Sequence, residues 1–292
     1  LQCILSCLDP NTIECIVELL ETSRKMSMID LTICLYSLRV YSINDHFVKE
    51  LLLALAGKLS TGNVSFNAQA VGNALYGLQN MSSEGKEVRD LLVVLRDQVG
   101  RCTEPLRAQA VGNALYGVLR FDLDTSWSWF IKVLLDSISQ CDGSNNFVDV
   151  GTILQSLCLI TSAKSYPLSQ SIKEMGLLDE IVLQKNRLVQ VFNAHPEVVS
   201  RIGVAVNRNE KKYFLAACGA FRDIPGVTLS NNEYIEGFEA DIVIRKESTI
   251  INVELDGPIH KHKLRTKRFC EARDRYLFDT VGVRVVRWEL MS

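Results

Sequence analysis

The feature that most constrains the fold of this chain is a decapeptide that occurs twice. The sequence AQAVGNALYG runs from Ala68 to Gly77 and recurs unchanged from Ala108 to Gly117, a period of 40 residues. Weaker copies lie one period earlier, at 28–38, and about one period later, at 149–157. Copies at this spacing predict stacked structural units, because a single unit of this size cannot bury its apolar face alone.

Each of the first three copies is followed by a second segment with apolar residues at helical spacing, namely 47–59, 88–99 and 127–138. We therefore expect each unit to be a pair of helices joined by a short polar turn, and the array to be an α-solenoid. Gly72, Gly77, Gly112 and Gly117 each cost about 1 kcal/mol inside a helix. They make sense where two helix backbones approach closely.

Two pairs of amide side chains recur in the decapeptides. Gln69 and Asn73 lie four residues apart, as do Gln109 and Asn113, so each pair shares one helix face. One interpretation is that these four residues line a groove and read RNA bases. The alternative is that they hydrogen-bond between neighbouring repeats, because a buried amide needs partners in any case.

Over roughly 27–157 the chain resembles the octotricopeptide family of organellar RNA-binding proteins, and the two AQAVGNALYG copies carry the resemblance. The resemblance implies an α-solenoid that grips single-stranded RNA. Cationic and acidic residues nearly balance between 24 and 140. Because cationic charge drives phosphate binding, we expect these repeats to bind RNA weakly on their own.

From about Leu178 the repeat register is lost, and 186–208 has no clear assignment. Beyond it the patterns predict a helix at 210–221, strands at 240–245 and 250–256, a basic helix at 263–280 and a last strand at 283–288. A four-residue loop between the first two strands would pair Arg245 with Ile250 and Asp241 with Glu254. Side chains alternate along a strand, so Asp256 would share the face of Glu254.

The register therefore predicts that Asp241, Glu254 and Asp256 converge at one end of the hairpin, with His260 at the rim and Glu210 as a candidate fourth acid. Clustered carboxylates raise one another's pKa unless a cation compensates them. One hypothesis is that Asp241 and Glu254 bind Mg²⁺ or Mn²⁺, which activates water against a phosphodiester, with His260 as general acid or base. The other is a surface acidic patch paired with nearby Lys and Arg.

The segment 210–288 resembles the RAP domain, which is itself similar to the restriction-endonuclease superfamily, including its very-short-patch-repair type. The matching stretches are ADIVI, VELDGPIH and EARDRYLFDTVGVRVVRW. The resemblance implies a restriction-endonuclease-like α/β fold and a role in organellar RNA metabolism. It places Asp241 and Glu254 at the metal-binding acids, Asp256 where many nucleases have a lysine, and His260 at the short-patch-repair histidine.

Cationic residues concentrate between 261 and 275, where only Glu271 and Asp274 are acidic. A solvated helix face is one explanation, and a surface that positions phosphates is the other. The predicted RNA-binding cations are Lys261, Lys263, Arg265, Lys267, Arg268 and Arg273.

The expected domains are a helical-repeat array at 1–178, a transition segment at 179–206 and a RAP domain at 207–292. We expect an organellar RNA-binding protein that acts in RNA processing, stability or translation. Its location would be the mitochondrion, or alternatively the plastid, and its partner a single-stranded transcript or rRNA. Two alternatives remain: a structural rRNA-binding component of a mitochondrial ribosome, contacting ribosomal proteins, and an endoribonuclease that uses Asp241, Glu254, Asp256 and His260.

The sequence gives no support for a membrane protein, a zinc site or a disulfide-rich fold. No run of about 18 apolar residues is present, so we expect no membrane span. The nine cysteines include no C-x-x-C pair, so neither a zinc site nor a disulfide framework is suggested.

Overall fold

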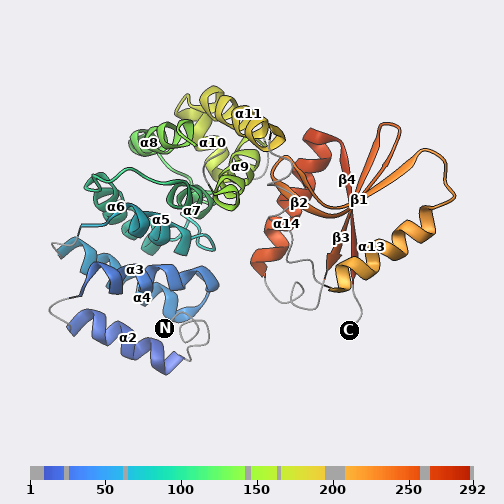
Figure 1. The fold of residues 1–292 in the computed structure, drawn as a ribbon. Helices are drawn as coiled ribbons and strands as arrows, with labels where there is room; N and C mark the ends of the chain where they lie inside the picture. Colours follow the sequence, from blue (N-terminus) through green and yellow to red (C-terminus); the bar gives the residue numbers. More distant parts are fainter. Residues whose placement is uncertain are drawn as a thin grey trace. The chain divides into compact units, whose positions relative to one another are not determined.

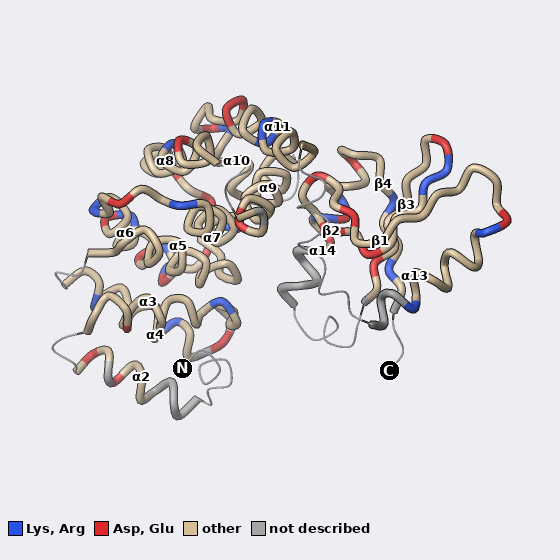
Figure 2. Tube along the Cα trace, viewed as in Figure 1, with Lys and Arg blue, Asp and Glu red and all other residues tan. Residues whose placement is uncertain are grey.

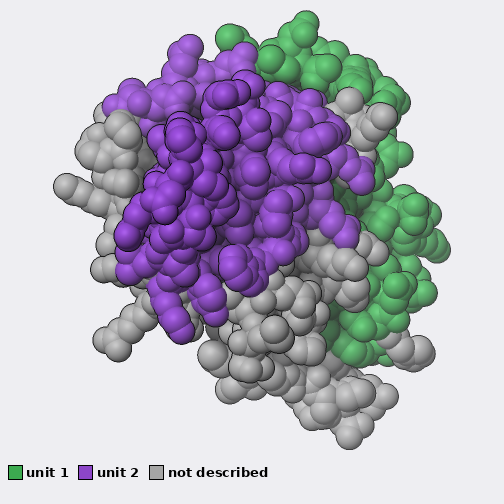
Figure 3. All heavy atoms as spheres, turned by 90° about the vertical axis from the view of Figure 1, so that its right-hand side faces the viewer, with its two compact units in different colours: residues 1–141, 166–184 green, residues 142–165, 185–292 purple. Residues whose placement is uncertain are grey.

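The computed structural model describes residues 10–22, 26–61, 65–141, 146–162, 166–194, 208–256 and 264–289. These residues form twelve α-helices and one sheet of four strands, with the sheet confined to the C-terminal part (Figure 1). The expected order of a helical region followed by an α/β region is therefore confirmed. The chain divides into two compact units, 1–141 with 166–184 and 142–165 with 185–292 (Figure 3). The expected domain boundaries stay predictions.

The first unit is built from helix pairs that follow the 40-residue period. Helices α3, α5 and α7 lie side by side in one layer, and α2, α4 and α6 lie side by side in another. The bounds are α2 (Pro10–Thr22), α3 (Met28–Ser37), α4 (His46–Thr61), α5 (Ala68–Gly77), α6 (Lys86–Gly100), α7 (Ala108–Val118), α8 (Ser128–Ser139) and α10 (Pro167–Glu174). Short 3₁₀ turns, Leu38–Val40 and Thr125–Trp127, follow α3 and precede α8.

Glycine allows the helices of the α3–α5–α7 layer to pack at backbone distance. A Cβ atom at Gly77 would overlap the carbonyl oxygen of Leu35, and one at Gly117 would overlap that of Leu75. A Cβ at Gly72 would lie 2.7 Å from the Cα of Ala110. The expectation that the repeated glycines mark close helix approach is therefore confirmed at these three positions.

The second unit contains the sheet, whose strand order is β1–β2–β3–β4. The bounds are β1 (Val227–Ile235), β2 (Phe238–Lys246), β3 (Thr249–Asp256) and β4 (Val283–Glu289). The first three strands are antiparallel neighbours, and β4 runs parallel to β3. The predicted pairing of Arg245 with Ile250 is confirmed, although Lys246 also pairs with Thr249 and leaves a turn of only Glu247 and Ser248.

The second unit also contains helices. They are α9 (Phe147–Thr161), the later part of α11 (Leu178–Ala194), α13 (Arg208–Phe221) and α14 (Leu264–Tyr276). Helix α14 links β3 to β4, as parallel strands require, and continues into a π-helical turn at Leu277–Val281. The core includes Phe238, Val243, Tyr276 and Val283, all essentially inaccessible to solvent.

Candidate nucleic-acid interface

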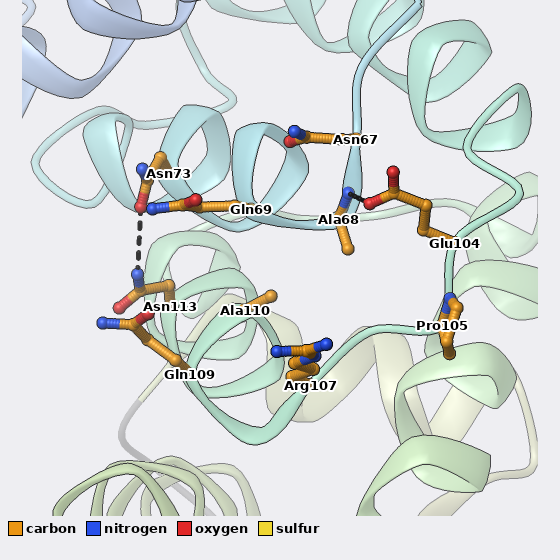
Figure 4. A pocket seen from close by; sticks show the side chains of 10 residues that line it. All are labelled: Asn67, Ala68, Gln69, Asn73, Glu104, Pro105, Arg107, Gln109, Ala110 and Asn113. Carbon is orange, nitrogen blue, oxygen red and sulfur yellow. Dashed lines mark hydrogen bonds between the residues drawn. The ribbon is translucent and has the colours of Figure 1, made fainter.

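The four repeated amides meet at one place in the first unit. Gln69 and Asn73 on α5 face Gln109 and Asn113 on α7 across an open pocket of about 370 Å³ (Figure 4). The sequence folds this way because two identical helices lie side by side and present the same positions to the same groove. The structure thus brings together all four residues that the repeat pattern singled out.

Hydrogen bonding in this pocket distinguishes the asparagines from the glutamines. Asn113 donates from Nδ2 to Oδ1 of Asn73 over 3.2 Å, which links the two repeats. Gln69 and Gln109 remain exposed at the pocket wall, while Asn73 and Asn113 are half-buried. The asparagines therefore join neighbouring helices, and the glutamines keep donors and acceptors available to a ligand.

Two charged residues complete the pocket, and both come from the segment that leads into α7. Glu104 accepts a hydrogen bond from the backbone N–H of Ala68 over 3.1 Å, at the N-terminus of α5. Arg107 is exposed and immediately precedes α7 (Figure 4). Sequence reasoning missed both residues because they lie outside the decapeptide and carry no periodic signal. Besides the four amides, the pocket therefore contains the carboxylate of Glu104, which is held by the backbone of Ala68, and the exposed guanidinium of Arg107.

A ladder of tyrosine rings runs along the same three helices. The Tyr36 and Tyr76 ring centroids are 5.7 Å apart, and those of Tyr76 and Tyr116 are 5.8 Å apart. The Arg39 guanidinium lies 4.1 Å from the Tyr36 ring centroid, within the range of a cation–π contact. The Leu-Tyr pair of each repeat is the sequence signal that marks this ladder.

The predicted carboxylate site is partly assembled in the second unit. Glu254 is buried, and its pKa is raised mainly by that burial, against the opposing charge of Arg273 and with a further increase from nearby Asp241. Asp241 accepts a hydrogen bond from the backbone N–H of Leu255 through Oδ2 over 2.7 Å. Asp241 and Glu254 therefore lie close together, and Asp241 is anchored to the strand that carries Glu254.

Both carboxylate oxygens of Glu254 already have partners. Oε1 accepts from Nδ2 of Asn252 over 2.7 Å, and Oε2 pairs with Nη2 of Arg273 at 2.9 Å. Arg273 also pairs with Asp274 at 3.0 Å, and Asp274 pairs with Arg287 at 2.7 Å. Among the described residues, the negative charge of Glu254 is therefore balanced by the neighbouring guanidinium of Arg273.

Arg273 is the one predicted RNA-binding cation whose side chain the structure describes, and it is only 8% exposed. Its guanidinium is directed at Glu254 and Asp274 inside the unit. This burial argues against a direct phosphate contact by Arg273. The sequence alone does not reveal this burial, because Arg273 stands among cationic neighbours in a strongly basic segment.

The remaining predicted residues fall at the edge of the described part or beyond it. Asp256 ends β3, Glu210 lies in α13, and Arg265, Lys267 and Arg268 lie in α14, but their side chains are outside the described residues. His260, Lys261 and Lys263 are wholly outside the described residues. Their roles at the site stay predictions.

Within the described ranges, no three His, Cys, Asp or Glu side chains are grouped so that they could hold a metal ion. Asp241 and Glu254 supply two oxygen-donor side chains, but Arg273 already provides a positive charge beside Glu254. The described residues alone therefore do not fit an Mg²⁺ or Mn²⁺ site, which normally draws on additional oxygen ligands.

The chain was compared with models of known protein families and with curated proteins. No model of a known protein family matches the chain, and no curated protein matches it. Across the residues that the structure describes, no helix combines the length and apolar character that a membrane crossing needs.

Proposed function

We propose that this chain is an organellar RNA-binding protein that acts in RNA processing, stability or translation, with the mitochondrion as its location. The observation that carries the proposal is the meeting of Gln69, Asn73, Gln109 and Asn113 in one open pocket. The helix pairs would form a short α-solenoid, and the α/β unit would be a RAP domain with an endonuclease-like fold. The RNA would be a single-stranded transcript or rRNA.

The chemistry of the pocket suits an unpaired base. A primary amide offers both donors and an acceptor, so it can match the edge of a base that is free of its Watson–Crick partner. Arg107 lines the same pocket and is exposed, and it would meet a backbone phosphate beside that base. Figure 2 shows Lys and Arg interspersed with Asp and Glu along the described helices of the repeat region. Such mixed charge implies modest affinity from the repeats alone.

The α/β unit is proposed to add binding strength rather than cleavage. Its predicted cations at 261–268 would contact phosphates, which dominate the affinity of proteins for nucleic acids. The pairing of Glu254 with Arg273 favours a binding role over metal-assisted hydrolysis, because the buried acid is compensated from within the protein.

The test compares RNA binding by the full chain and by the variant Gln69→Ala/Asn73→Ala/Gln109→Ala/Asn113→Ala. Fluorescence anisotropy with single-stranded RNA libraries should show a loss of affinity of at least about ten-fold for the preferred RNA, because a paired base edge contributes about 1–3 kcal/mol. The control is Gln140→Ala, which removes an exposed amide outside the pocket. Equal affinity of the fourfold variant and the unmodified chain would contradict the proposal.

A further inference from the structure

A second cavity lies entirely within the unit that contains the sheet. Its volume is about 360 Å³, within the range of about 300–1,000 Å³ that is typical of small-molecule sites. Its walls come from α9, α11 and the β1–β2 hairpin. It shares no residue with the amide pocket of α5 and α7.

One wall of this cavity is apolar and firmly held. Leu154 and Phe192 are buried, and the Phe192 ring centroid lies 6.2 Å from that of Tyr234. Gly237 packs so closely on α9 that a Cβ there would lie 2.8 Å from the Leu154 side chain. Its carbonyl also accepts a hydrogen bond from Nε2 of Gln155 over 2.8 Å. The cavity is therefore lined by two neighbouring aromatic rings, Phe192 buried and Tyr234 half-buried.

Three amide side chains also line the cavity. Asn193 on α11 and Asn231 and Asn232 on β1 line it, and none of the three side chains makes a hydrogen bond with any described residue. Asn232 has a φ of +49°, a left-handed conformation that is unusual within a strand. Burial raises the pKa of Tyr234 to about 12, with a further increase from Glu239, so its hydroxyl remains a donor at neutral pH.

The acidic side chains at this cavity already have counter-charges. Glu233 forms a two-pronged ion pair with Arg245 and accepts a further hydrogen bond from Ser230. Glu236 accepts from the Tyr276 hydroxyl over 2.9 Å, and the ammonium of Lys185 lies 3.9 Å from the same carboxylate oxygen. Because each carboxylate is compensated, the cavity favours an uncharged ligand over a cation or an anion.

We propose that this cavity binds a single purine base, with adenine preferred. The base would pack against the Phe192 and Tyr234 rings, and its polar edge would meet the amides of Asn231 and Asn232. An asparagine can bond adenine in a bidentate manner, through the ring N7 and the exocyclic amine. The base could belong to free adenosine or to an unpaired position of RNA. The second case rests on the proposed RNA-binding function, and the first does not.

The test is a titration of the full chain with adenosine, followed by saturation-transfer NMR of the nucleoside protons. We expect saturable binding that is weakened at least about ten-fold in Asn231→Ala/Asn232→Gly, since one bidentate pair contributes about 1–3 kcal/mol. Glycine at 232 keeps the positive φ while removing the amide. The control Asn186→Ala removes an exposed amide from α11 outside the cavity and should bind as the unmodified chain does.

Competition identifies the source of the base. If a short oligoadenylate displaces adenosine and itself binds more weakly to the double variant, the site takes a base of RNA. If it does not displace adenosine, the site takes the free nucleoside. Failure of the α5–α7 variant to lose RNA affinity would overturn the proposed function but leave adenosine binding intact. No saturable adenosine binding, or binding that the double variant retains in full, would overturn this inference alone.

Discussion

At the residue scale, Arg273 determines the chemistry of the carboxylate end of the sheet. It places a guanidinium 2.9 Å from the carboxylate of Glu254, where both side chains are about nine-tenths buried. Removing Arg273 leaves the buried carboxylate of Glu254 without a counter-charge, and this costs more free energy than the pair itself contributes. Asp274 and Arg287 extend the pair into a network of alternating charges.

We therefore predict that Arg273→Ala lowers the free energy of unfolding of the α/β unit by about 3–5 kcal/mol. Amide hydrogen exchange of β3 and β4, measured over a urea titration, reports on this unit. Arg275→Ala is the matched control, because Arg275 lies two residues further along the same helix and is exposed. It should change stability by less than about 0.5 kcal/mol. Equal effects of the two substitutions would mean that the Glu254–Arg273 pair does not stabilise the fold.

A second residue-scale prediction concerns Glu233. Burial tends to raise its pKa, but hydrogen bonds from Arg245 and Ser230 outweigh that effect and hold the pKa below its ordinary value of 4.5. A carboxyl whose folded pKa is depressed stabilises the fold above its unfolded pKa and loses that contribution as the pH falls through the folded value.

Glu233→Gln should accordingly destabilise the protein at neutral pH, and this difference should shrink as the pH falls below 4.5. Urea-unfolding midpoints measured across that window check the effect. Glu271→Gln, which alters an exposed carboxyl on α14, serves as the control. Its unfolding midpoint should differ little from that of the unmodified chain, both at neutral pH and below pH 4.5. A Glu233→Gln difference that stays constant with pH contradicts the assignment.

At the scale of elements, the spacing between α5 and α7 depends on a missing side chain. Gly117→Ala would force its methyl group into the carbonyl of Leu75, and backbone cannot move aside as a flexible side chain can. We predict a loss of about 1–3 kcal/mol in unfolding free energy. Gly57→Ala in α4 is the control: nothing lies within 4 Å of the new methyl group, so a gain of about 0.5–1 kcal/mol is expected. Thermal unfolding followed by circular dichroism distinguishes them, and stabilisation by both substitutions would contradict the close packing.

Elements with a strong local period were predictable from sequence. The decapeptide helices, the second helices of the pairs and strands β2, β3 and β4 appear within a few residues of their expected positions. Strand β1 was missed, because its sequence VTLSNNEYI has a polar centre and Asn232 there adopts a positive φ. Its pairing with β2 comes from a two-residue turn at Glu236 and Gly237, which only the folded sheet reveals.

The two candidate sites differ in how far the sequence could predict them. The amide pocket follows from repetition alone, since equal positions on adjacent equivalent helices must face one groove. The Glu254–Arg273 pair joins a strand to a helix nineteen residues away, and it depends on how α14 packs against β3. Charge patterning predicted that Arg273 lies on a solvated or phosphate-binding helix face, but tertiary packing buries its side chain.

At the scale of the whole molecule, we propose that RNA recognition is divided between base reading by the repeats and phosphate binding by the basic segment. We predict that Lys263→Ala/Lys267→Ala/Arg268→Ala reduces the salt dependence of RNA binding, lowering the slope of log affinity against log salt by about 2 if all three contact phosphates. The control replaces three exposed lysines of α4, α6 and α8, namely Lys49, Lys86 and Lys132, which do not line the amide pocket. A slope unchanged by the first variant, or lowered equally by both, contradicts this division.

We propose that single-stranded RNA occupies the amide pocket, and ultraviolet crosslinking of the full chain to single-stranded RNA tests this most directly. Mass spectrometry of the crosslinked peptides should place nucleotides on the segments that contain Gln69–Asn73 and Gln109–Asn113. The adjacent Tyr76 and Tyr116 rings provide photoreactive groups on the same helices. Crosslinks that appear at saturating RNA only outside residues 67–116 would contradict the account.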